Sequence, residues 1–186
     1  MAKIRTFICI ELTKDIKEKI SVLQAELKSH KADIRWTRPD SIHLTIRFLG
    51  DVEESLIKDI AQNLKAAINK QKFEISVKGT GAFPNFRRPK VLWIGIFDPE
   101  GHLQQLNEII ENELAKLGFA KELRKFSPHL TIGRVKSMLN VNRIASDLQI
   151  REFDAGTFTA NEVVIMQSDL KPSGPVYTPL STLELK

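Results

Sequence analysis

Apolar and polar positions follow two different spacings along the chain, and the spacing switches repeatedly from one end to the other. Alternation with a period of two predicts strands over residues 4–11, 34–37, 73–77, 91–97, 158–167 and 176–183. Apolar positions three and four residues apart predict helices that begin after Thr13, near Leu56, at Asp98 and near Val141. The order of strands and helices is therefore similar before and after the middle of the chain.

A short phrase occurs once in each half. Ser41-Ile42-His43-Leu44-Thr45-Ile46-Arg47 is matched by Ser127-Pro128-His129-Leu130-Thr131-Ile132-Gly133-Arg134. Residues i and i+2 of a strand point to the same face, so each copy presents its histidine and threonine together while its leucine and isoleucine face a core. We expect two imidazoles and two hydroxyls that are displayed in the same way.

The similar halves predict an α+β fold in which two related lobes face a shared cleft. Several connections are too short for parallel crossovers, so the sheets are expected to be mostly antiparallel. No linker or low-complexity segment divides the chain, and we therefore expect residues 1–186 to form a single bilobal domain.

Composition excludes several classes of protein. No apolar run approaches the roughly 20 residues of a membrane-spanning helix, and the N-terminal residues lack the pattern of a signal peptide. The lone cysteine, Cys9, lies in the first alternating run, where a small buried residue is expected and a reactive thiol is the alternative. These features predict a soluble protein of the reducing cytoplasm.

The charge of +5 and the pI near 9.3 are modest, and solvated surface charge is one explanation for them. The distribution is more informative, because basic residues crowd the segments around both histidine motifs. They are Arg35, Arg38, Arg47, Arg87, Arg88, Lys90, Lys121, Arg124, Lys125, Arg134 and Lys136. This crowding favours a partner with several phosphates.

Two paired histidines suit displacement at phosphorus, where the attacking and leaving oxygens lie on opposite sides of the transferred group. One imidazole then accepts a proton and the other donates one, and histidine supplies both forms near neutral pH. A hydrogen-bonded core histidine and a metal ligand are the alternatives. The duplication disfavours the first, and the lack of a second histidine, a cysteine pair or a carboxylate at matching positions disfavours the second.

Candidate phosphate ligands adjoin the histidines. The hydroxyls of Thr45 and Thr131 are expected to donate to the non-bridging oxygens as charge accumulates there. Arg134 is the first candidate for an added cation, because Gly133 permits a bulge that turns its successor toward the histidine. Arg47, which simple alternation places on the histidine face of its strand, is the second candidate.

Three aromatic residues have an open role. Trp36, Phe48 and Phe86 are candidates for stacking on a base, and packing at the core or at the rim of the cleft is the favoured alternative for each.

Together these features resemble the two-histidine (2H) phosphoesterase superfamily, and specifically its RNA 2′,3′-cyclic phosphodiesterases, also called 2′-5′ RNA ligases. The resemblance spans nearly the whole chain. It is carried by Arg5-Thr6-Phe7-Ile8, Arg35-Trp36-Thr37-Arg38-Pro39, His43-Leu44-Thr45-Ile46-Arg47-Phe48-Leu49-Gly50, Gly81-Ala82-Phe83-Pro84, Val91-Leu92-Trp93, Phe126-Ser127-Pro128-His129-Leu130-Thr131-Ile132-Gly133-Arg134 and Tyr177-Thr178-Pro179-Leu180.

The resemblance implies a pseudo-two-fold bilobal fold, with two mostly antiparallel sheets flanking a central cleft and helices on the outside. It implies that His43 is the proton donor and His129 the proton acceptor, with no metal and no cofactor. The implied reaction opens RNA 2′,3′-cyclic phosphates to 2′-phosphomonoesters. Reversible 2′-5′ ligation to 5′-hydroxyl RNA, such as tRNA halves, is the implied side activity.

Two other functions remain open from the residues. One is an esterase for a small cyclic nucleotide, and the other is a non-catalytic module that binds RNA or nucleotides. The paired histidines disfavour the binding module, because binding alone has no need of two titrating groups. We expect a monomer that processes RNA without a membrane partner.

Overall fold

The computed structural model describes residues 2–172 and 174–186 and contains two antiparallel sheets. One sheet has the order β3 (His43–Glu53), β1 (Lys3–Glu11), β8 (Glu162–Lys171) and β9 (Gly174–Glu184). The other has the order β2 (Ile34–Trp36), β6 (His129–Val135), β5 (Val91–Phe97), β4 (Phe73–Phe83) and β7 (Asp154–Ala160). Every strand pair in both sheets is antiparallel, which confirms the predicted α+β class.

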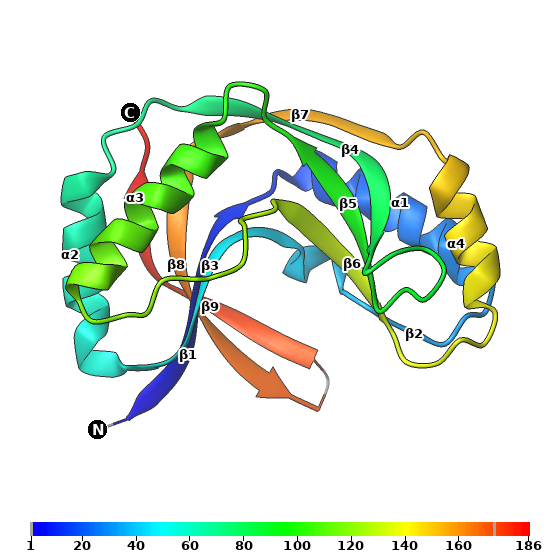
Figure 1. The fold of residues 1–186 in the computed structure, drawn as a ribbon, viewed down its shortest axis with the longest axis horizontal. Coiled ribbons are helices and arrows are strands. Elements are labelled where there is room, and N and C mark those ends of the chain that lie inside the picture. The colour runs from blue at the N-terminus through cyan, green and yellow to red at the C-terminus, as the bar shows by residue number, and fades with distance from the viewer. Residues whose placement is uncertain (1, 173) are drawn as a thin grey trace.

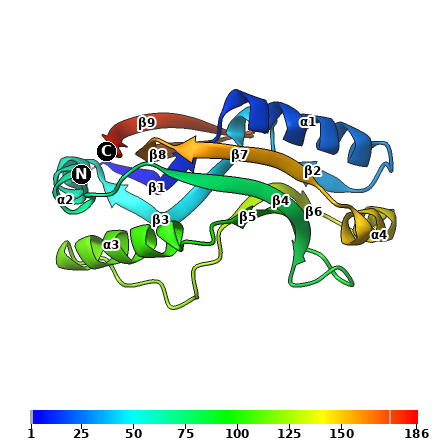
Figure 2. The same cartoon turned by 90° about the horizontal axis from the view of Figure 1, so that it is seen from above.

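Four α-helices lie around the sheets (Figures 1 and 2). They are α1 (Lys14–Lys28), α2 (Ile57–Ala67), α3 (His102–Lys116) and α4 (Val141–Ile150), and two short 3₁₀ turns cover Pro39–Ser41 and Glu54–Leu56. Helices α2 and α3 lie at one end of the molecule, and α4 lies at the other end (Figure 1). Each helix buries the apolar stripe that the sequence pattern predicts.

One prediction about the strands is wrong. The alternating stretch at residues 158–167 is two strands, because β7 ends at Ala160 and β8 begins at Glu162 in the other sheet. The single residue between them, Asn161, carries the chain from one sheet to the other. Alternation alone does not reveal this change, since both strands have apolar residues at similar spacing.

A single apolar cluster joins the two sheets. It includes Ile8 of β1, Ile94 of β5, Leu130 of β6 and Ile165 of β8, none of which is exposed to solvent. A smaller apolar cluster on the other face of β1 and β8 contains Cys9, which is fully buried as predicted.

Candidate active site

The two histidine motifs lie on β3 and β6, one strand from each sheet, and these two strands contact one another. The histidine and threonine of each motif are half-buried, and the leucine between them is fully buried in the shared core. The four half-buried residues are His43, Thr45, His129 and Thr131. Each motif strand thus presents its histidine and threonine at a partly accessible face, and the two strands contact one another.

A β-bulge follows the threonine on β6. The register with β5 passes directly from Thr131 to Gly133, which leaves Ile132 as an extra residue. A bulge shifts the alternation of side chains by one position. The shift places Arg134 on the face that carries His129 and Thr131, where the sequence argument expected it.

A second bulge occurs at the equivalent position of β3. There the register with β1 passes from Thr45 to Arg47, and Ile46 is the extra residue. The shift turns Arg47 off the face of His43 and puts Phe48 onto that face. Phe48 is 57% exposed, so its ring is available to a ligand.

Each bulge is held by a buried amide side chain from a helix that precedes the other motif. Gln24 of α1 donates from Nε2 to the carbonyls of Ile132 and Thr37, both at 2.8 Å. Asn107 of α3 donates from Nδ2 to the carbonyl of Ile46 at 3.1 Å. A bulge disrupts the sheet ladder locally, and these amides satisfy the buried carbonyls at that point.

The expectation that Arg47 is a second phosphate ligand is corrected. Its Nε lies 2.5 Å from a carboxylate oxygen of Glu111, and Nη1 lies 3.7 Å from Glu122. Nη2 also donates to the carbonyl of Ala120 at 2.6 Å, and the side chain is only 12% exposed. This guanidinium therefore fastens β3 to α3 and the segment after it.

For Trp36, the structure supports the packing alternative and not the stacking one. Trp36 pairs with Gly133 on the face opposite Arg134 and packs against the main core. A Cβ on Gly133 would lie 3.2 Å from a ring carbon of Trp36, so glycine here allows close packing of the indole. Trp36 supports the back of β6 and does not face the histidine.

The two histidines present the same nitrogen. Nδ1 of His43 lies 2.9 Å from the carbonyl of Ser41, and Nδ1 of His129 lies 2.7 Å from the carbonyl of Ser127. A carbonyl only accepts, so Nδ1 carries the hydrogen in both rings. In the neutral form Nε2 is then the basic nitrogen, and this holds equally for both histidines.

Aromatic rings fix the orientation of His43. The imidazole stacks on Phe7 with ring centroids 4.6 Å apart, and the ring of Tyr177 meets it edge-on at 5.0 Å. Phe7 and Tyr177 also contact each other, and Phe48 adjoins Phe7 at 5.9 Å. The direction in which Nε2 of His43 points is therefore constrained by the packed rings as well as by the hydrogen bond to Ser41.

A different pair of rings surrounds His129. Phe83 meets it edge-on at 4.9 Å, and Trp93 lies 6.4 Å away and contacts Phe83 at 5.3 Å. Gly81 makes room for the indole, since a Cβ there would lie 2.0 Å from Cζ2 of Trp93. The sequence argument did not predict that Phe83 and Trp93 support His129. The signal that was available is their spacing of two residues from Gly81 and Val91, which places each pair on one face of its strand.

The charges around His43 break the symmetry between the two sites. Burial lowers the pKa of His43 below its ordinary value, and Lys17 acts in the same direction. The carbonyl of Ser41 and the carboxylate of Glu11 act to raise this pKa. Glu11 is the register partner of His43 on β1 and forms an ion pair with Lys17 at 3.1 Å, whereas His129 has Gly95 at the equivalent place.

Arg134 also acts on the first histidine's surroundings. Burial raises the pKa of Tyr177, while the guanidinium groups of Arg134, Arg38 and Arg5 act to lower it. The charge of Arg134 on β6 therefore acts on Tyr177, which contacts His43 of the other motif. Three arginines near one phenol make this region attractive to an anion.

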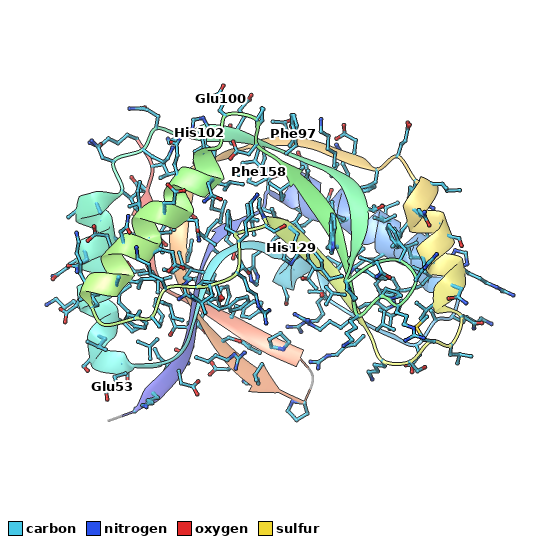
Figure 3. The ribbon with its side chains drawn as sticks, in the orientation of Figure 1. Glu53, Phe97, Glu100, His102, His129 and Phe158 are labelled. Carbon is cyan, nitrogen blue, oxygen red and sulfur yellow. The ribbon has the colours of Figure 1, made fainter. Side chains whose placement is uncertain are left out.

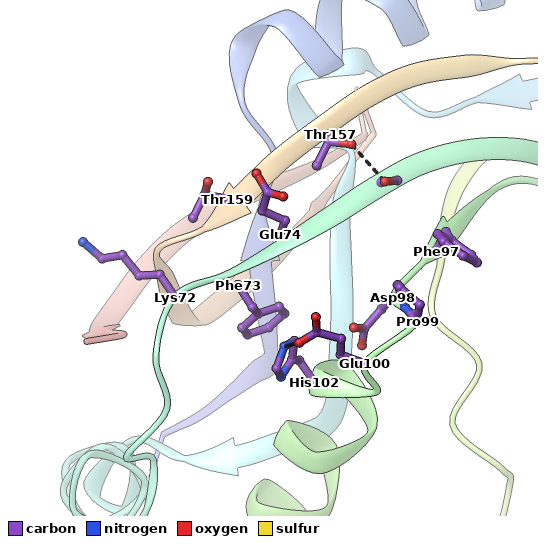
Figure 4. A pocket seen from close by; sticks show the side chains of 11 residues that line it. Lys72, Phe73, Glu74, Phe97, Asp98, Pro99, Glu100, His102, Thr157 and Thr159 are labelled. Atoms are coloured by element: carbon purple, nitrogen blue, oxygen red, sulfur yellow. Dashed lines mark hydrogen bonds and ion pairs between the residues drawn. The ribbon is translucent and has the colours of Figure 1, made fainter.

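Within the part of the chain that the structure describes, two of the cavities lie outside this site. One, of about 410 Å³, lies between β4, β7 and the start of α3, and it is lined by three carboxylates, Glu74, Asp98 and Glu100 (Figure 4). Figure 3 places His102 and Glu100 in this region, away from His129 at the start of β6. The other cavity, of about 580 Å³, lies between the β4–β5 connection and α4.

Within residues 2–172 and 174–186, no cluster of three or more histidine, cysteine, aspartate or glutamate side chains is arranged to hold a metal ion. Over the same residues, none of the helices is long and apolar enough to cross a membrane.

Comparisons with known proteins agree with the duplicated pattern. A family model described as LigT like Phosphoesterase matches the chain twice, over residues 10–93 and 94–177. Each match contains one histidine motif.

Curated relatives match over almost the full chain. A protein of Methanothermobacter thermautotrophicus named RNA 2′,3′-cyclic phosphodiesterase is 34% identical over 98% of this chain and 100% of its own length. A protein of Methanocaldococcus jannaschii with the same name is 36% identical over 93% of this chain and 96% of its own.

Solved structures share the fold. The apo form of E. coli LigT superposes with a TM-score of 0.81 at 25% identity, over 100% of this chain and 99% of that one. A crystal structure of a Thermus thermophilus protein gives 0.81 at 24% identity, over 97% of both chains, and shows likeness of fold alone.

Proposed function

The chain belongs to the LigT-like phosphoesterase family, and on that premise we propose that it hydrolyses RNA 2′,3′-cyclic phosphate ends to 2′-phosphomonoesters. The observation that carries the proposal is the matched presentation of two imidazoles with Nδ1 bonded to a carbonyl. Two Nε2 atoms are then available for proton transfer, one to each side of a phosphorus atom. The names of the relatives support RNA as the substrate.

In the proposed reaction, water attacks the cyclic phosphorus in line with the bond to the 3′ oxygen. His129 accepts the proton of the water as the new P–O bond forms, and His43 donates a proton to the 3′ oxygen as its bond to phosphorus breaks. The product keeps phosphate on the 2′ oxygen and has a free 3′ hydroxyl. After the reaction His129 carries the proton from water and His43 is neutral. His129 then releases a proton to solvent and His43 takes one up, which restores the starting state of the pair.

Three further side chains are proposed to bind the phosphate. Thr45 and Thr131 share the faces of the two histidines and supply hydroxyl donors, and Arg134 supplies a charge-assisted contact. Phe48 is a candidate for contact with a base, because it is exposed next to Phe7 on the same face.

The ligation activity follows from the same groups. If a 5′ hydroxyl of RNA replaces water as the attacking group, the product is a 2′-5′ linkage, and the reverse reaction regenerates the cyclic end. Water is far more concentrated than any RNA end, so we propose hydrolysis as the main activity. We further propose that the protein works as a single-domain monomer in the cytoplasm, where its RNA substrate and a reduced Cys9 are expected.

The test uses an oligonucleotide that ends in a 2′,3′-cyclic phosphate, incubated with the protein in EDTA. The proposal predicts a 2′-phosphate product, located by resistance of the product to an enzyme that removes only 3′-phosphates. A 3′-phosphate product would contradict the assigned direction of attack. Absence of turnover with retained RNA binding would instead favour the non-catalytic module.

A further inference from the structure

The cavity between the β4–β5 connection and α4 has the size of a small-molecule site and is lined mostly by polar residues. Its volume of about 580 Å³ falls within the range of ordinary ligand pockets. Asn142, Ser146 and Gln149 line it from α4, where their spacing of four and three residues puts them on one face of the helix. Asn85 and Phe86 line it from the connection between the strands.

The two segments that build this cavity carry more basic than acidic residues. Residues 84–90 contain no aspartate or glutamate, and residues 134–149 contain one, Asp147, which forms an ion pair with Arg151. Their basic residues are Arg87, Arg88, Lys90, Arg134, Lys136 and Arg143. The cavity beside α3, by contrast, is lined by three carboxylates, which repel a phosphate chain.

The β4–β5 connection links the cavity to the proposed active site. Phe83 contacts His129, and the chain needs only two further residues to reach Asn85 at the cavity, a span of at most about 7 Å. Lys90 donates its backbone N–H to the carbonyl of Phe83, and its own carbonyl accepts from Val135 at the end of β6. The connection is therefore anchored to the end of the motif strand that carries Arg134.

We propose that this cavity binds the penultimate nucleotide of a single-stranded RNA chain, the one before the nucleotide that carries the cyclic phosphate. The inference rests on the proposed function for the identity of the chain end. Phe86 packs against the main core as Trp36 does, but it also lines the cavity, where its half-buried ring offers a surface for a base. The amides of Asn142 and Gln149 offer donors and acceptors to base edges. Arg87, which also lines the cavity, neutralises the adjoining phosphate.

The first experiment measures binding, so that it stands apart from catalysis. A 5′-fluorescein RNA tetranucleotide with a 2′-phosphate end is titrated by anisotropy, and the corresponding 2′-mononucleotide is titrated by calorimetry. The double variant Asn142→Ala and Gln149→Ala changes exposed helical positions, where alanine favours the helix. The matched control is Gln62→Ala with Asn63→Ala on α2, at the opposite end of the molecule (Figure 1).

We expect the cavity variant to bind the tetranucleotide about tenfold more weakly than wild type, which is the loss expected from one or two hydrogen bonds. Its affinity for the mononucleotide should stay within about twofold of wild type. The control should leave both affinities unchanged. Equal weakening of both ligands, or unchanged tetranucleotide affinity, would overturn the proposal.

A second measurement tests the path of the chain. We expect Arg87→Ala to reduce the slope of log Kd against log salt by about 0.7 for the tetranucleotide, the value for one phosphate contact on a single strand. Arg124→Ala, in the basic segment before β6, should leave the slope unchanged. The opposite pattern would place the RNA over that segment and reject the cavity. Turnover of a cyclic-phosphate tetranucleotide by the wild-type protein is assayed separately. Failure of the proposed hydrolysis and failure of the proposed nucleotide site are therefore distinguishable.

Discussion

The amides that hold the two bulges give the sharpest test of how the fold shapes the site. Replacing Asn107 by Leu removes the donor to the buried carbonyl of Ile46, and an unsatisfied buried group costs about 1–3 kcal/mol. Replacing Gln24 by Leu removes a donor from the carbonyls of Thr37 and Ile132, but the carbonyl of Ile132 still accepts the backbone N–H of Thr37 at 3.0 Å, so about one such cost applies. The loss is partly offset, because Oε1 of Gln24 is itself buried without a partner among the described residues. We expect each variant to lose about 1–3 kcal/mol.

Urea denaturation at pH 7 measures this loss, and turnover of a cyclic mononucleotide measures its effect on the site. Each variant should also lower kcat, since the bulge beside Ile46 or Ile132 sets the direction of the neighbouring threonine. Gln104→Leu on the exposed face of α3 is the control, with an expected change within about 0.5 kcal/mol. If both buried variants behave like this control, the amides do not hold the bulges and the reasoning fails.

Four other outcomes are expected. His43→Ala and His129→Ala should each lower kcat by about 10²–10⁴-fold, and the double variant should be little worse than either single one; near-normal turnover by one single variant would exclude the two-imidazole mechanism. Turnover should survive prolonged dialysis against EDTA, because the two imidazoles supply both proton transfers, and loss of turnover that one divalent ion restores would contradict this. The lowered pKa of His43 means that the unfolded chain binds its proton more readily, so stability should fall as the pH drops below about 6.5; His43→Asn should reduce that slope in urea titrations from pH 7 to pH 5, and an unchanged slope would refute it. Gly81→Ala should cost about 1–3 kcal/mol and change the tryptophan fluorescence, because its Cβ displaces Trp93; Gly118→Ala, whose positive φ strains the backbone without a side-chain clash, is the control that should leave the fluorescence unchanged.

Local pattern was enough to predict most of the elements. The helical stripes and the motif strands lie where the spacing places them, because each element buries one face in the shared core. The boundary at Asn161 was missed, because a change of sheet depends on distant partners and not on local alternation. The same limit applies to β4. The alternation predicts a strand over residues 73–77, whereas β4 continues to Phe83.

Prediction of side-chain direction on the motif strands succeeded where a local residue carried the signal. Gly133 correctly indicated that alternation breaks before Arg134. No glycine marks the equivalent bulge at Ile46, so Arg47 was assigned to the wrong face. That bulge is specified by Asn107, which is far away in sequence.

The duplicated motif makes the two histidines equivalent in sequence, and their surroundings make them different. His43 is enclosed by Phe7 and Tyr177 and has Glu11 as its strand partner, whereas His129 has Gly95 in that place. Burial makes the cation of His43 a stronger acid, which suits a group that must give its proton to a leaving oxygen. A proton donor must nevertheless be protonated before it reacts. The negative charge of Glu11 acts to raise the pKa of His43, and the charge of an arriving phosphate has the same effect. Glu11→Gln should therefore move the alkaline limb of kcat/KM to lower pH if His43 is the proposed donor. If His43 is instead the acceptor, the acidic limb will move to lower pH, and the two roles must be exchanged.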